Sequence, residues 1–446
     1  MKKDDIELSK DYKFIMDSDG NIVKTNNIRR NHCILPWINF ATNIFGKPRI
    51  CGYSYHTEQW KSIFEKKGLE WPPSKETPEK LKGTQFEKEF LSWSRGLQNS
   101  STQDEWNGLY FREIRKSFLK NEWPENCKRC KHVEELNGRS KRMDENHMWS
   151  EKYKDLVDLT NEDGSVPYHP PHMDVRTGTV CNFKCIHCSP ASSSRWLEDR
   201  NAIEKYGYEH VVNDNTWIAK ENTFWDSLDI SQIKRYNFLG GESFYNKRHN
   251  DFIKKLNESK YANEVEIAYV SNGSLKFENM QNFKKVRLRL SVDCPEKAGE
   301  YFRYGLNWND WCQNIKEFPP NFDVSFQWTC SNVSMFYLID TYSILRDKFP
   351  NIRFLFENHV TEPYHLSVQN LPLEIKEEIK EKINKCEFDD TAKEKIPFYV
   401  NHMFEKDPWS EKGKIFIEYL QDLDRIRNTN WKESLCGLEN RLNGLI

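Results

Sequence analysis

The sequence lacks an excess of charge of either sign, because 66 lysine and arginine residues face 68 aspartate and glutamate residues and leave a net charge of −2. This balance gives no electrostatic argument for a nucleic-acid or a membrane partner. No apolar run approaches the length of about 18 residues that a membrane-spanning helix needs. The first 30 residues are polar and lack the apolar core of a signal peptide, so we expect a cytoplasmic protein.

Cysteine, in contrast, is abundant, and its distribution indicates metal ligation. Twelve cysteines in a chain without an export signal are poorly explained by disulfides, which persist in oxidising compartments. Seven of them stand in closely spaced or patterned groups, as metal-ligating cysteines do. The other five stand alone, as small buried apolar residues often do: Cys294, Cys312, Cys330, Cys386 and Cys436.

The 446 residues are enough for two or three domains, and the pattern changes along the chain. Residues 208–225 are predicted to be a long insertion, and an apolar stripe every four residues (Ile375, Ile379, Ile383) predicts a helix near the end. We predict five segments: a polar arm over 1–30, a small metal-supported module over 31–150, a linker over 151–172, an α/β core over 173–361 and a helical region over 362–446.

The core segment alternates strand-like runs with helix-length polar segments. Strands are predicted near 173–179, 235–239, 265–271, 286–292, 322–329 and 352–357. Helices are predicted between them near 193–206, 244–257, 276–283, 297–317 and 335–347. Such a repeat predicts a parallel sheet, either open or curled into a partial barrel, with the C-terminal strand ends on the side where sites usually form.

Directly after the first predicted strand, Cys181, Cys185 and Cys188 are spaced as C-x3-C-x2-C. Three thiolates on one loop can bind three irons of a four-iron cluster and leave the fourth iron open to another ligand. A closed structural zinc site needs four ligands, which His187 would complete, so zinc remains an alternative.

This loop resembles the signature of the radical S-adenosylmethionine superfamily, and Phe183 fits the aromatic residue that often precedes the second cysteine. The resemblance implies a partial (β/α)6 TIM-like barrel, a [4Fe-4S] cluster on Cys181, Cys185 and Cys188, and S-adenosylmethionine chelated to the open iron. In that family, reductive cleavage of the cofactor gives a 5′-deoxyadenosyl radical that abstracts a hydrogen atom from the substrate.

Three further motifs resemble this family in chain order, each at the end of a predicted strand. Gly240-Gly241-Glu242 resembles the GGE motif that accepts hydrogen bonds from the cofactor's ammonium group, although Ser243 replaces the usual proline. The sequence around Asn272 is similar to a T-N-G segment, and that around Asp293 resembles S-x-D. The cofactor-binding residues implied are Gly240, Gly241, Glu242, Ser271, Asn272, Ser291 and Asp293.

A second cysteine group precedes the core: Cys33, Cys51, Cys127 and Cys130. From spacing alone, this four-ligand set suits zinc or a four-iron cluster. The C-x12-G-x4-C spacing that ends at Cys51 resembles the SPASM-type auxiliary-cluster domains attached to many radical S-adenosylmethionine enzymes. Leu136 stands where the two-cluster form has another cysteine, so the short twitch form with one [4Fe-4S] cluster fits better. Those domains usually follow the core, whereas this one precedes it.

The resemblance implies an oxidoreductase or epimerase that acts on a sugar, an alcohol or a peptide, with an electron donor such as flavodoxin or ferredoxin. Cys294 and Cys330 follow strand ends and are candidate hydrogen donors for epimerisation. Arg303, in a segment that resembles the family after S-x-D, is given no role. A non-catalytic zinc-binding adaptor and a two-cluster electron carrier are the alternative functions.

Overall fold

The computed structural model describes residues 14–16, 22–24, 27–28, 32–71, 81–97, 100–136, 138–207, 217 and 224–443. The predicted insertion over 208–225 lies outside these residues, apart from Trp217, Phe224 and Trp225. Of the predicted polar arm, only the short antiparallel strands β1 (Phe14–Met16), β2 (Ile22–Lys24) and β3 (Asn27–Ile28) are described. No described helix is long and apolar enough to cross a membrane.

The chain folds into two compact units. The first comprises Met1–Gly178, Trp217–Asn237 and Ser259–Val265, and the second comprises Thr179–Thr216, Phe238–Glu258 and Glu266–Ile446. The division into five segments remains a prediction.

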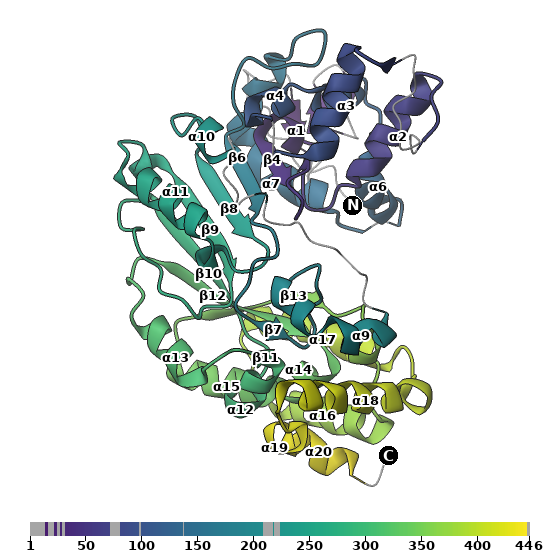
Figure 1. Ribbon diagram of the computed structural model, residues 1–446, viewed down its shortest axis with the longest axis vertical. Coiled ribbons are helices and arrows are strands. Elements are labelled where there is room, and N and C mark those ends of the chain that lie inside the picture. Colours follow the sequence, from purple (N-terminus) through teal and green to yellow (C-terminus); the bar gives the residue numbers. More distant parts are fainter. Residues whose placement is uncertain are drawn as a thin grey trace, which may run out of the picture. The chain divides into compact units, whose positions relative to one another are not determined.

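Eight strands form one sheet in the order β13-β12-β10-β9-β8-β6-β4-β5. Its strands β9, β10, β12 and β13 are joined in parallel, and helices connect β10 to β12 and β12 to β13 (Figure 1). The order leaves β13 and β5 at the two edges, so the sheet does not close on itself, which is consistent with the predicted partial barrel. The predicted α/β class is therefore confirmed, and the six predicted strands are β6 (His172–Arg176), β8 (Arg235–Leu239), β9 (Glu266–Ser271), β10 (Lys285–Ser291), β12 (Asp323–Cys330) and β13 (Arg353–His359).

Two strands missing from the sequence prediction extend the sheet beyond β6. Strand β4 (Asn39–Thr42) runs parallel to β6 and antiparallel to β5 (Pro48–Arg49). The turn between them is held by Asn43, whose Oδ1 accepts hydrogen bonds from the backbone N–H groups of Phe45 and Lys47. Strands of four and two residues are too short to show a period in sequence.

Helices make up most of the rest of the first unit. A Pro at the start of α1 suits the first turn of a helix, where its missing N–H has no partner to lose. The helices are α1 (Leu35–Ile38), α2 (His56–Lys66), α3 (Gln85–Arg95), α4 (Thr102–Trp106), α5 (Leu109–Leu119), α6 (Lys128–Glu135), α7 (Lys141–Tyr153), α8 (Asp155–Asp158) and α10 (Phe224–Ser227).

The second unit departs from the predicted helices at three places. Residues 276–283 form no helix. The long helix predicted over 297–317 is divided by β11 (Arg303–Tyr304), which pairs with β7 (Lys184–Cys185). The helix predicted over 193–206 is divided into two 3-10 helices, Ser194–Glu198 and Glu204–Tyr206, on either side of a four-residue α-helix. Helix α17 (Asp390–Phe404), which contains Pro397, lies in the region predicted to be helical. The other helices are α9 (Arg200–Ile203), α11 (Lys247–Glu258), α12 (Glu296–Phe302), α13 (Trp308–Lys316), α14 (Asn332–Phe336), α15 (Leu338–Lys348), α16 (Leu373–Lys385), α18 (Trp409–Arg427), α19 (Trp431–Ser434) and α20 (Cys436–Leu442).

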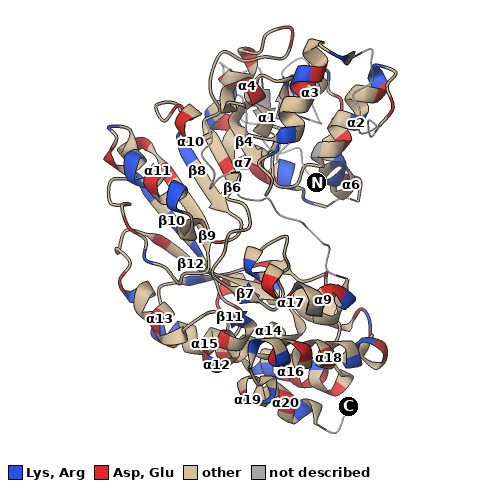
Figure 2. Cartoon of the chain, in the orientation of Figure 1, with Lys and Arg blue, Asp and Glu red and all other residues tan. Residues whose placement is uncertain are grey.

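Charges of both signs are interspersed along the helices α16 and α18, in agreement with the small net charge (Figure 2). On α16 the pairs Glu378–Lys382 and Glu381–Lys385 are one helical turn apart. Such exposed pairs contribute little to stability and mainly keep the surface hydrated.

A buried histidine makes the stability of the first unit depend on pH. His172 is buried, its Nε2 lies 3.0 Å from the Tyr153 hydroxyl, and burial lowers its pKa to about 3. In the unfolded chain the pKa of a histidine is near 6.5. The contribution of neutral, buried His172 to the free energy of unfolding is therefore complete above pH 6.5 and is lost as the pH falls. Between pH 7 and pH 5 we expect a loss of about 2 kcal/mol that His172→Gln removes.

Urea unfolding followed by tryptophan fluorescence at both pH values measures this difference. His147 is exposed, so His147→Gln is the matched control and should keep the full pH dependence. An unchanged pH dependence in His172→Gln would show that burial does not lower the pKa of this ring in the folded protein.

Candidate active site

The three cysteines of the C-x3-C-x2-C loop lie together in the second unit. Cys181 and Cys185 are buried in one apolar cluster with Phe183, and Cys188 packs against it. Cys185 lies in β7, which pairs with β11, and the backbone N–H of Cys188 donates to the Cys185 carbonyl at 3.0 Å. The local fold therefore brings the three cysteine side chains of this short segment together.

A pocket of about 190 Å³ lies against this loop, and all three cysteines line it. The other walls come from the C-terminal ends of neighbouring parallel strands, as the predicted strand order requires. The structure brings five of the seven predicted cofactor-binding residues to this pocket: Gly240, Gly241, Ser271, Asn272 and Ser291.

Glu242 is buried beside the pocket without lining it. Its carboxylate accepts hydrogen bonds from the Ser271 hydroxyl at 2.9 Å and from the backbone N–H of Asn272 at 2.8 Å. Burial raises the pKa of Glu242 to about 7. Glu242 therefore joins the loop after β8 to the end of β9, and within the GGE motif it is the glycines that face the pocket.

Asp293, the other predicted residue that does not line the pocket, is fully buried in an ion pair. Its Oδ2 lies 2.7 Å from Nη2 of Arg303, and its Oδ1 accepts a hydrogen bond from the backbone N–H of Thr329. Arg303 lines the pocket and its Nη1 also donates to Sγ of Cys185 at 3.9 Å. Arg303 had no predicted role, and its only signal in the sequence was the position shortly after S-x-D.

Gly241 allows the glycine turn to contact the cysteine loop. Its φ is +45°, a β-carbon there would lie 2.2 Å from the Val180 carbonyl oxygen, and the next backbone N–H, of Glu242, donates to that oxygen at 2.8 Å. An alanine therefore carries both backbone strain and a steric clash next to Cys181. We expect Gly241→Ala to lower the free energy of unfolding by about 3 kcal/mol.

The matched control is Gly207→Ala in the same unit. Gly207 also has a positive φ, of +79°, but no atom of the described residues lies within 4 Å of the position that a β-carbon would take, so only the strain of about 1 kcal/mol remains. Chemical denaturation compares the two variants. Equal losses would contradict the close approach at Gly241.

The candidate hydrogen donors Cys294 and Cys330 are both buried, and neither lines the pocket. Cys330 follows Thr329 in β12, and successive side chains of a strand face opposite sides of the sheet. Thr329 lines the pocket, so Cys330 is directed away from it. Burial raises the pKa of both thiols.

Five further polar residues line the pocket although they were not predicted: Ser192 and Ser193 after the cysteine loop, and Gln327, Thr329 and Asn358. The last three belong to the sheet. They stand at the C-terminal ends of β12 and β13, and register pairs Thr329 with Asn358. In the sequence, these residues are distinguished only by their alternate positions near strand ends. That pattern can be assigned to the pocket only when the register of the paired strands is known.

Helix α18, in the predicted helical region over 362–446, supports the cysteine loop. The Tyr419 hydroxyl donates to the Ile186 carbonyl at 2.7 Å. Nε of Arg427 donates to Asp199 at 3.1 Å, and Asp199 also pairs with Nζ of Lys184 at 2.8 Å. These contacts fix the backbone on both sides of Cys185.

The second cysteine group meets in the first unit. Cys33, Cys51, Cys127 and Cys130 line one small cavity, although nearly one hundred residues separate the first from the last. Each of the four thiols interacts electrostatically with the other three. Lys141 and Arg142 line the same cavity and would offset the negative charge of thiolates.

The two cysteine groups offer three thiols in the second unit and four in the first, and thiolates are the ligands of iron–sulfur clusters. Four thiolates also suit a structural zinc ion. Within the described part of the chain, no three His, Cys, Asp or Glu side chains are gathered around one point as for a single bound metal ion.

No protein-family model and no curated protein matches the chain. Among solved structures, it is similar to "Native anSMEcpe with bound AdoMet", with 15% identity and a TM-score of 0.31 over 47% of this chain and 58% of that one. It is also similar to Streptococcus suis SuiB bound to S-adenosylmethionine, with 14% identity and a TM-score of 0.29 over 61% and 59% of the two chains. The chain thus spans less than two thirds of each of these structures.

Proposed function

We propose that the protein is a radical S-adenosylmethionine enzyme whose active site is the pocket beside Cys181, Cys185 and Cys188. The observation that carries this proposal is that the three cysteines and the ends of four parallel strands, β9, β10, β12 and β13, line one pocket. Three thiolates can hold a [4Fe-4S] cluster and leave one iron free. With S-adenosylmethionine on that iron, the cluster supplies a 5′-deoxyadenosyl radical that takes a hydrogen atom from the substrate.

The residues around the pocket have the chemistry that this cofactor needs. Backbone groups of Gly240 and Gly241 can approach an ammonium group closely, because no side chain intervenes. The guanidinium of Arg303 offers a positive charge to a carboxylate. Ser271, Asn272 and Ser291 offer hydroxyl and amide groups to a ribose.

In this proposal, Cys33, Cys51, Cys127 and Cys130 bind an auxiliary [4Fe-4S] cluster, as in twitch domains. Four protein thiolates would leave no open iron, so the role that suits this cluster is electron transfer. The substrate is a sugar, an alcohol or a peptide that is oxidised or epimerised, and a flavodoxin or a ferredoxin is the electron donor.

The direct test is cofactor cleavage. Protein purified and reconstituted without oxygen, then reduced with dithionite, should convert S-adenosylmethionine to 5′-deoxyadenosine and methionine, both measured by mass spectrometry. Boiled protein is the control. Fully loaded protein that forms neither product would rule out the proposed chemistry.

A further inference from the structure

Two arginines of the first unit lie against the same glycine without a carboxylate partner. Nη1 of Arg49 donates to the Gly52 carbonyl at 3.4 Å, and Nη2 of Arg176 lies 3.7 Å from the position that a β-carbon on Gly52 would take. In the part of the chain that the structure describes, neither guanidinium forms an ion pair with an acidic side chain. Two positive charges are therefore held near each other with no anion between them.

The strand register places both side chains on one face of the sheet. Ala41 of β4 pairs with Arg49 of β5 and with Asp174 of β6, and directly paired residues point to the same face. Arg176 is two residues beyond Asp174 on β6 and therefore shares this face. Asp174 and Arg176 are half-buried rather than fully buried, so a small molecule can reach this face.

The burial of Arg49 makes the missing partner costly. Arg49 is 9% exposed, and of its five N–H donors only the one to Gly52 has an acceptor among the described residues. A buried charge normally has a counter-ion, because its desolvation is otherwise uncompensated. Nε of each arginine is buried without an acceptor, whereas both terminal nitrogens of Arg176 and Nη2 of Arg49 are accessible and remain free to donate within the described structure.

The local charge selects the kind of anion. Lys141 is neutralised by Glu145, since its Nζ lies 2.6 Å from Oε1 of that residue. Arg49 and Arg176 then face one negative charge, that of Asp174, which interacts electrostatically with both but is not within ion-pairing distance of either. The remaining single positive charge suits a monoanion, and two guanidinium forks suit a planar carboxylate.

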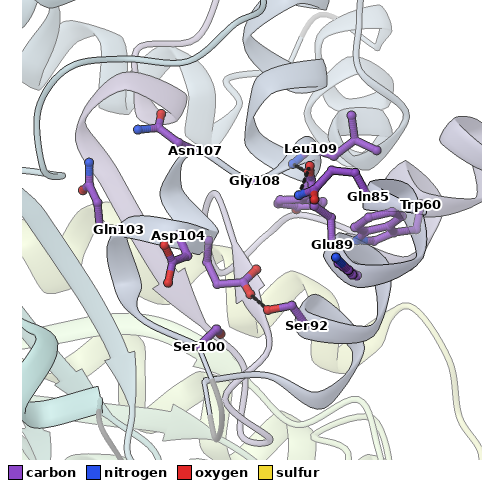
Figure 3. A pocket seen from close by; sticks show the side chains of 13 residues that line it. Trp60, Gln85, Glu89, Ser92, Ser100, Gln103, Asp104, Asn107, Gly108 and Leu109 are labelled. Atoms are coloured by element: carbon purple, nitrogen blue, oxygen red, sulfur yellow. Dashed lines mark hydrogen bonds between the residues drawn. The ribbon is translucent and has the colours of Figure 1, made fainter. Parts of the chain in front are cut away.

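A cavity of about 530 Å³ elsewhere in the first unit offers no such pair of cations (Figure 3). Among the described residues that line it, Lys88 is the only basic one, and it is exposed. Its carboxylates already accept hydrogen bonds, Glu89 from the backbone N–H of Leu109 and Glu105 from the Ser92 hydroxyl. An anion is therefore not expected in this cavity, and Lys88 provides a control.

We propose that Arg49 and Arg176 bind the carboxylate group of a small organic acid. Each guanidinium would donate to one carboxylate oxygen, in the space beside Gly52. Neither arginine lines the cavity of the second cysteine group, where Lys141 and Arg142 are the basic residues. The proposal uses no residue of the cysteine pocket and does not depend on the function proposed for it.

The test is calorimetric titration of the full-length reconstituted protein, at low ionic strength, with acids and their neutral amides. The pairs are N-acetylglycine with N-acetylglycinamide, benzoate with benzamide, and succinamate with succinamide, and inorganic phosphate represents a dianion. We expect at least one acid to bind ten-fold or more tightly than its amide and than phosphate. Arg49→Gln and Arg176→Gln should each weaken that acid ten-fold or more, and Arg176→Lys, which keeps the charge and loses the fork, several-fold.

A second measurement examines the same geometry without a ligand. Gly52→Asp would supply a carboxylate next to both guanidinium groups, so it should raise the midpoint of urea unfolding and abolish binding of the acid. Gly52→Asn has the same size without the charge and should not raise the midpoint. Lys88→Gln should leave binding of the acid unchanged.

Four results would overturn the proposal: equal binding of acids and amides, no binding by any acid, tighter binding of phosphate than of every acid, or no difference between Gly52→Asp and Gly52→Asn. Iron content and cleavage of S-adenosylmethionine are measured in Arg176→Gln in parallel. The iron content should stay at the parent value, and a loss would assign the arginine to a cluster instead. The cleavage assay keeps failure of this proposal separate from failure of the proposed function.

Discussion

Cys181→Ala should reduce 5′-deoxyadenosine formation to the level of a protein-free reaction. Cys181 is one of only three thiols on the proposed cluster, and the loss of one ligand leaves two irons without protein thiolates. The reconstituted variant should also lose about four irons per chain and keep about four at the second cysteine group. Mass spectrometry of the reaction and iron analysis of the protein measure the two effects.

Cys312→Ala is the matched control, because Cys312 is a lone buried cysteine of the same unit on α13. It removes the same atoms outside the pocket, so cofactor cleavage should continue at the parent rate. If Cys181→Ala kept both its iron and its cleavage activity, the assignment of the cluster to this loop would be wrong.

Arg303→Met should destabilise the second unit and stop cofactor cleavage. Arg303 is buried, and its removal leaves the fully buried carboxylate of Asp293 without its partner cation. Breaking a buried ion pair on one side costs about 3–5 kcal/mol, which chemical denaturation measures directly. The variant also loses the donor to Cys185, so activity should fall even where the protein remains folded.

Two companion variants separate charge from packing. The double variant Arg303→Met with Asp293→Asn removes both charges, and should recover part of the stability but none of the activity. Arg353→Met breaks an exposed pair with Asp323 and should cost less than about 1 kcal/mol. A loss in Arg303→Met as small as that in Arg353→Met would contradict the buried pair.

The six core strands were predictable because each is a short β-branched or aromatic run followed by a turn. Strand β4 was not, since it pairs with β6 across more than one hundred residues, and β5, which pairs with β4, has only two residues, so neither leaves a local period. The helix predicted over 276–283 fails for the same reason, because tertiary context overrode local preference.

The motifs that stand at strand ends in the sequence lie at the pocket, whereas the side chains of Glu242 and Asp293 are buried beside it. Cys181, Gly241 and Ser271 reach the pocket as predicted from their order in the chain. Whether Glu242 faces the pocket or the protein interior depends on side-chain direction, which the motif does not encode. The pairing of Arg303 with Asp293 likewise depends on how β11 pairs with β7, a contact absent from any local pattern.

The most direct measurement of the central claim is the content of iron, acid-labile sulfide and zinc per chain, after anaerobic purification and cluster reconstitution. Two four-iron clusters predict about eight irons and eight sulfides, with zinc absent. About four irons together with one zinc would keep the proposed active site and remove the auxiliary cluster. Zinc alone, with no iron taken up, would contradict the account.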